Sequence, residues 1–124
     1  MSPGIFVQIH IGLARASVIF SLIIGVYGLW RYFRNSGVSQ DFWGVLAAGE
    51  VLYLAQAVVG VVMVSLGLRP GRWVHYLYGL LSVITLPGAF SFMRGREGRR
   101  EVLIYALIGL FMAGVSLRAM DTVR

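Results

Sequence analysis

The stretch Ile5–Trp30, IFVQIHIGLARASVIFSLIIGVYGLW, decides the fold of this chain. It is longer than the roughly 20 apolar residues that an α-helix needs to cross the hydrocarbon core of a bilayer, and Arg15 is its only formally charged residue. No basic region precedes it, and it is longer than the apolar part of a secretory signal peptide. We therefore expect it to be a transmembrane helix of the mature protein.

The whole chain shares this apolar character. Of its 124 residues, 58% are hydrophobic and 13% are charged, with a mean hydropathy of +0.79. A soluble globular chain carries about 25% charged residues. The composition predicts a small integral membrane protein in contact with the lipid bilayer, and the length excludes a multidomain enzyme.

Three further apolar segments follow the first. The predicted helices cover about residues 5–32, 42–68, 73–93 and 101–119, within a single transmembrane domain, 1–124. Each break between them contains glycine, and the second adds Pro70, which ends a helix. Connections this short force neighbouring helices to be antiparallel. The sequence thus predicts an all-α, up-down-up-down four-helix bundle, with a kink at Pro87.

The formal net charge of +6 comes from arginine alone, because the chain has no lysine. The arginines lie between the apolar runs, so we interpret them as topology signals and expect no nucleic-acid partner. The first and third connections between the predicted helices hold six arginines, and the opposite side of the membrane holds four. This bias predicts a multi-pass protein of the plasma membrane with both termini extracytoplasmic. The two sets are Arg31, Arg34, Arg94, Arg96, Arg99 and Arg100, and Arg69, Arg72, Arg118 and Arg124.

Several chemistries are excluded by missing residues. The chain has no cysteine, so it can have neither a disulfide scaffold nor a thiolate metal site. It contains no phosphate-binding loop, no His-Glu-x-x-His and no hydrolase triad motif. A transporter of this size would have to dimerise to build a pathway. A stand-alone enzyme is therefore less favoured than an electron-transfer or accessory subunit.

The two histidines, His10 and His75, lie near the starts of the first and third predicted helices. These helices run parallel in such a bundle, so both imidazoles fall at similar depth near one membrane face. Two neutral imidazoles facing each other across a bundle are the ligands of a six-coordinate haem iron. Small residues follow on the same helical faces, and they permit either close helix packing or a slot for a flat ligand. These are Ser17, Ser21, Gly25 and Gly28 after His10, and Gly79, Ser82 and Ala89 after His75. The alternative is a pair of interfacial polar residues above ordinary packing faces.

Arg15 lies about 7 Å deeper than His10 along the first helix. The only acid expected on that side is Asp121, so a haem propionate is a candidate partner for this arginine. Alternatively, Arg15 pairs with Asp121 or extends its side chain toward the membrane interface. Three further arginines border the same face as candidate propionate contacts: Arg69, Arg72 and Arg118.

Glu50 belongs to the other half of the membrane, at a depth similar to that of Tyr27 and Tyr105. One interpretation is a neutral glutamic acid that hydrogen-bonds between helices. The other is a contact to a quinone head group or a proton-transfer step. On the same predicted helix, the amide of Gln56 lies among glycines and must find a hydrogen-bond partner across the bundle.

One region resembles the haem A synthase family. The pattern comprises Leu54-Ala-Gln56-Ala-Val-Val-Gly60, then Gly67-Leu-Arg-Pro70 and His75, together with His10-Ile-Gly-Leu-Ala14-Arg15. The 124 residues would correspond to one four-helix half of such a protein. The resemblance implies that His10 and His75 are axial haem ligands and that Gly79 packs on the haem. Val7 and Ile11 replace the family's acidic residue and its arginine, so a shared scaffold for haem b is implied rather than haem hydroxylase chemistry.

Two functions follow from these observations. The first is a small membrane-embedded b-type cytochrome that transfers electrons, as a subunit of a respiratory or photosynthetic complex. The second is a cofactor-free accessory subunit of a larger membrane complex, for which four helices with small-residue faces suffice. Both imply other membrane-protein subunits as partners.

Overall fold

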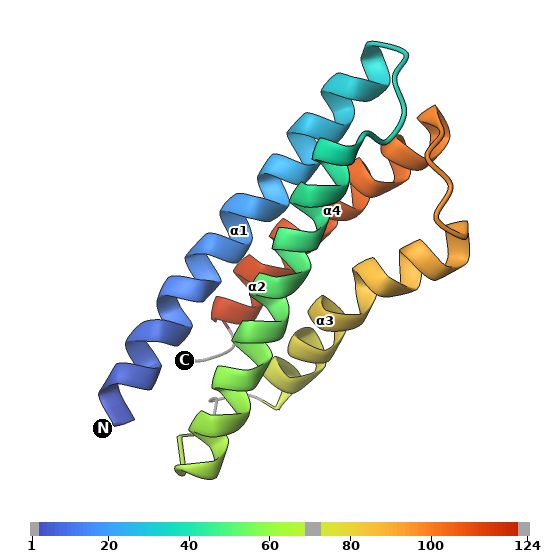
Figure 1. Ribbon diagram of the computed structural model, residues 1–124. Coiled ribbons are helices and arrows are strands. Elements are labelled where there is room, and N and C mark those ends of the chain that lie inside the picture. The colour runs from blue at the N-terminus through green and yellow to red at the C-terminus, as the bar shows by residue number, and fades with distance from the viewer. Residues whose placement is uncertain (1–2, 69–72, 122–124) are drawn as a thin grey trace.

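The computed structural model describes residues 3–68 and 73–121, and within them the chain forms four α-helices. All four are long and apolar enough to cross a membrane, so the chain is a multi-pass membrane protein. The shortest has 20 residues, or about 30 Å at 1.5 Å per residue. Figure 1 shows the helices as an up-down-up-down bundle, as the short connections predict. Their bounds are α1 Pro3–Phe33, α2 Gln40–Ser65, α3 Val74–Met93 and α4 Arg99–Asp121.

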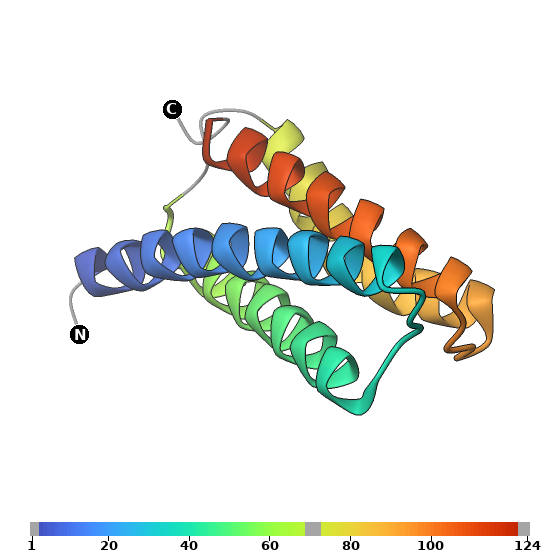
Figure 2. The same ribbon diagram turned by 90° about the horizontal axis from the view of Figure 1, so that it is seen from above.

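The helices are not packed equally. α1 lies closely against α4 and α2, whereas α3 contacts α2 and α4. α3 continues as one helix through Pro87, and Figures 1 and 2 show its C-terminal part leaning away from α2. The start of α1 and the end of α4 lie at the same end of the bundle as the end of α2 and the start of α3 (Figure 1).

Glycines set the close approach of α1 and α4. A Cβ added to Gly28 would lie 2.7 Å from the Cβ of Ala106, and one added to Gly109 would lie 2.8 Å from the backbone oxygen of Ser21. Gly25 faces Leu110 in the same interface. The small residues after His10 were predicted to permit either close helix packing or a slot for a flat ligand. Gly25 and Gly28 serve helix packing.

The hydrophobic core lies toward the end of the bundle that holds the α1–α2 and α3–α4 connections. Phe42, Val102 and Tyr105 are almost completely buried there, together with Met93. The six arginines of those connections lie at the same end, which we call the arginine-rich end. The opposite end, which holds the two histidines, is the histidine end.

The two connections at the arginine-rich end are bonded to each other. The backbone N–H of Val38 donates to the carbonyl of Glu97 at 2.8 Å. Trp43 donates its indole N–H to the carboxylate of Glu97 at 2.5 Å. Gly37 lies so close to the backbone of Glu97 that no larger residue would fit. These contacts fix the starts of α2 and α4 relative to each other.

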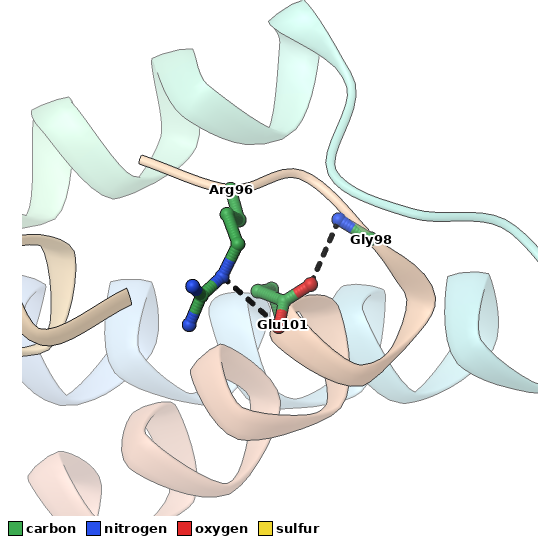
Figure 3. Close-up of polar contacts among 3 residues, drawn as sticks. All are labelled: Arg96, Gly98 and Glu101. Carbon is green, nitrogen blue, oxygen red and sulfur yellow. Dashed lines mark hydrogen bonds and ion pairs between the residues drawn. The ribbon is translucent and has the colours of Figure 1, made fainter. Parts of the chain in front are cut away.

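Capping residues define where these helices begin. The hydroxyl of Ser39 accepts from the backbone N–H of Phe42 at 3.1 Å, which caps α2. At α4, Glu101 reaches back and accepts from the backbone N–H of Gly98 at 3.1 Å (Figure 3). Its other oxygen is 4.0 Å from Nε of Arg96. A carboxylate in the first turn also interacts favourably with the helix dipole.

Candidate functional site

The two histidines lie next to each other at the histidine end, one from α1 and one from α3. Their ring centroids are 6.1 Å apart, and the ring planes are inclined at 61°. Both side chains are partly buried. α1 and α3 occupy diagonal positions in the bundle, so the imidazoles meet across its interior. The depth shared by His10 and His75, expected from their positions in parallel helices, is what allows this contact.

His75 is oriented by the last turn of α4. Its Nδ1 lies 2.9 Å from the backbone carbonyl oxygen of Ala119. A carbonyl oxygen only accepts, so Nδ1 carries the proton and the lone pair of the neutral ring is on Nε2. The bond therefore joins α3 to the last turn of α4.

His10 is held through its backbone rather than its ring. The side-chain amide of Gln56 donates to the carbonyl oxygen of His10 at 3.0 Å, which confirms the hydrogen bond expected across the bundle. The Nδ1 of His10 is buried and has no hydrogen-bond partner among residues 3–68 and 73–121. Oε1 of Gln56 and Oγ of Ser17 are also buried without a hydrogen-bond partner in the described residues. Ser17 lies two turns after His10 on the same face of α1. Two unsatisfied polar atoms, Nδ1 of His10 and Oε1 of Gln56, thus lie close to the histidine pair.

One glycine lies near each histidine. Gly60 of α2 is adjacent to His10, where an added Cβ would lie 3.6 Å from Cε1 of the imidazole. Gly79 follows His75 by one turn, and a Cβ there would meet nothing within 4 Å. Gly79 therefore borders open space on the face of α3 that carries the histidine.

The arginines considered for haem propionates are placed differently from one another. Arg15 is exposed, and it follows His10 by five residues, about 140° around the helix. Arg118 is exposed on α4 and directly precedes Ala119, the residue that fixes His75. Arg69 and Arg72 lie outside the described residues.

A chain of hydroxyl groups lies deeper in the bundle. The phenol oxygen of Tyr53 is 2.5 Å from Oγ of Ser21 and 2.8 Å from Oγ of Ser116. It links α2 to both α1 and α4. Sequence reasoning missed Tyr53 and Ser116. The available signal was the position of Tyr53, three residues before Gln56 on the same face of its helix.

Glu50 and Tyr105 line one cavity of 210 Å³ between α2, α3 and α4. Tyr27 is not among the residues that line it. Its ring instead packs edge-on against Phe42, with centroids 5.5 Å apart. The structure thus brings together two of the three residues expected to share this depth.

The described part of the chain contains no group of three His, Asp or Glu side chains that would hold a metal ion. A histidine pair by itself suits haem iron, because the macrocycle supplies the remaining four ligands. No protein-family model, curated protein or solved structure matches this chain. The resemblance to the haem A synthase family stays a prediction from the quoted residues.

Proposed function

We propose that this chain is a small b-type cytochrome of the membrane, in which His10 and His75 are the two axial ligands of haem iron. The observation that carries the proposal is the separation of 6.1 Å between the ring centroids. Two imidazoles bound to one metal ion from opposite sides have ring centres about 6 Å apart, because each metal–nitrogen bond is about 2 Å and the ring centre lies about 1 Å further on. This spacing supports the binding of haem iron by the two residues.

The surroundings of each ring support the same assignment. Metal-binding histidines almost always donate the other ring N–H to a carboxylate, a backbone carbonyl or water. The bond from His75 to the carbonyl of Ala119 is of this kind and directs the lone pair of Nε2 away from it. A buried ring nitrogen without a partner in the described residues, as in His10, is costly unless a ligand compensates for it.

The protein would position the haem and exclude water from it. Bound haem supplies one-electron transfer, and with both axial positions filled by nitrogen it has no open site for oxygen chemistry. Gln56 fixes the backbone of α1 at His10, and Gly79 borders open space one turn after His75. Arg118, next in sequence to Ala119, and Arg15 on α1 are the described candidates for propionate contacts.

Electron transfer by so small a protein requires donors and acceptors outside the chain. We therefore place it in a respiratory or photosynthetic complex, with its haem near the extracytoplasmic face of the plasma membrane. Ten large apolar side chains on α2 and α3 are exposed, and they provide surface for lipid and for partner subunits.

The test is the absorption spectrum of the protein purified in detergent from a haem-replete host, oxidised and then reduced, with a pyridine assay of haem content. We expect a sharp reduced α-band and about one haem per chain. His10→Ala and His75→Ala should each abolish it while the helical circular dichroism is retained. Gln8→Ala, an exposed residue at the same end of α1, is the matched control and should keep the haem.

Ligation is separated from packing by chemical rescue. In His75→Gly, added imidazole should restore the six-coordinate spectrum if the lost side chain is an iron ligand. A folded, colourless wild-type protein would overturn the proposal and would favour the cofactor-free accessory subunit instead.

A further inference from the structure

A groove between α2 and α3 lies away from the histidine pair. Its outer part measures 530 Å³ and runs along Leu54, Val83, Ile84 and Gly88. The inner part is the 210 Å³ cavity lined by Trp43, Phe90 and Tyr105. Glu50 and Pro87 line both parts, so the outer groove and the inner cavity adjoin at these two residues. It lies where α3 leans away from α2 (Figure 1).

The mouth of the groove faces lipid. Leu54 and Ile84 are 46% and 51% exposed on helices that span the membrane. Among the described residues that line the outer part, Glu50 is the one with an ionisable group, and Ser91 adds one hydroxyl. A molecule entering here must therefore be soluble in the bilayer.

Two of the residues that line the inner cavity carry buried hydrogen-bonding atoms that lack partners. Oε1 of Glu50 and the phenol oxygen of Tyr105 are buried with no hydrogen bond to any described residue. Tyr105 is only 1% exposed. In addition, Pro87 has no N–H to donate to the carbonyl of Val83, one turn earlier on the groove wall. Unsatisfied polar groups at membrane depth each cost free energy, so a ligand that bonds to them gains from their burial.

The walls of the cavity favour a flat ring. Trp43 packs edge-on against Phe90 and Tyr105, with centroids 5.6 and 5.7 Å away. The indole N–H of Trp43 is already engaged by Glu97, which fixes the ring. A planar ligand would find aromatic surface here, and its polar edge would face Tyr105 and Glu50. A neutral carboxyl group and a phenol both donate and accept, so they match carbonyl or hydroxyl groups on that ring.

We infer that this groove binds a quinone, with its head group between Glu50 and Tyr105 and its apolar tail along the outer groove toward the lipid. A quinone combines a flat ring, polar oxygens at the ring edge and solubility in the bilayer. The binding site does not depend on the proposed haem. Tyr27, which lies against Phe42, takes no part in it.

The probe is a benzoquinone with a decyl tail, titrated into the full chain in detergent while tryptophan fluorescence is recorded. Quinones quench nearby indoles, and Trp43 lines the cavity. We expect saturable quenching that disappears in Trp43→Phe. Because the signal is tryptophan emission rather than a haem band, the result stands whether or not the haem proposal does.

Three substitutions test the geometry. Tyr105→Phe and Glu50→Leu each remove one hydrogen-bonding partner and should weaken binding about five- to tenfold. Glu50→Gln keeps a neutral donor and acceptor and should bind nearly as well as the wild type. Gly88→Leu fills the outer groove, where an added Cβ meets nothing within 4 Å, and should abolish binding in a folded protein.

Matched controls come from the same helices. Gly44→Leu adds the same side chain to an exposed, open position of α2 outside the groove, and Tyr76→Phe removes an exposed phenol from α3. Both should bind like the wild type. Quenching that is non-saturable, or equal in all variants, would mean that the quinone only partitions into the micelle or that lipid or a partner helix occupies the groove. Either result would overturn the proposal.

Discussion

Replacing Gly109 with alanine tests how closely α1 and α4 pack. A Cβ at this position would lie 2.7 Å from Cγ2 of Ile24, 2.8 Å from the backbone nitrogen of Gly25 and 2.8 Å from the backbone oxygen of Ser21. Carbon atoms in good contact are about 3.5–4.0 Å apart. The added methyl group is therefore about 0.7 Å too close to its neighbours, two of which are backbone atoms that cannot rotate away. The two helices would have to separate.

The expected magnitude follows from two opposing effects. Overpacking of this kind costs about 1–3 kcal/mol. Alanine in place of a helical glycine returns about 0.5–1 kcal/mol by reducing the entropy lost on folding. We expect Gly109→Ala to lower the free energy of unfolding by about 1–2 kcal/mol. Gly114→Ala is the matched control on α4, because a Cβ there meets nothing within 4 Å. It should leave the stability unchanged or raise it by up to about 1 kcal/mol.

The assay is unfolding of detergent-solubilised protein by sodium dodecyl sulfate in mixed micelles, followed by circular dichroism and tryptophan fluorescence. The two alanine variants are compared under identical lipid and detergent conditions. Equal stability of Gly109→Ala and Gly114→Ala would refute the close contact of α1 and α4, and with it the assignment of the small residues after His10 to helix packing.

Two further predictions concern polar contacts. Tyr53→Phe removes the hydrogen bonds to Ser21 and Ser116 and should lower the free energy of unfolding by about 1–2 kcal/mol in the same assay. An unchanged free energy of unfolding would mean that both serine hydroxyls find equally good hydrogen-bond partners within their own helices. Glu101→Ala removes the acceptor for the N–H of Gly98 and should cost about 0.5–1 kcal/mol. Glu101→Gln retains that acceptor and should lose less, so an equal loss in both variants would contradict a capping role.

Much of the fold was predictable because a membrane span is a local property of the sequence. The thickness of the bilayer fixes how many consecutive apolar residues a helix needs, and a connection of a few residues fixes the antiparallel order. The predicted spans agree with the observed helices apart from shifts at their ends. α2, for example, ends at Ser65 rather than near Leu68. The similar depth of His10 and His75 also follows from position along parallel helices.

The sequence alone determined that this is a four-span membrane protein with two histidines at one depth, since chain length, hydropathy and helix direction need no knowledge of neighbours. Only the tertiary structure decided which faces meet: that Gly25 and Gly28 pack against α4, that Tyr53 joins three helices, and that Glu50 shares its cavity with Tyr105 but not with Tyr27. The physical reason is the solvent. A helix in lipid is apolar on its outer and inner faces alike, so hydrophobic periodicity does not identify the inner face, which is set by close packing and by hydrogen bonds between residues far apart in the chain.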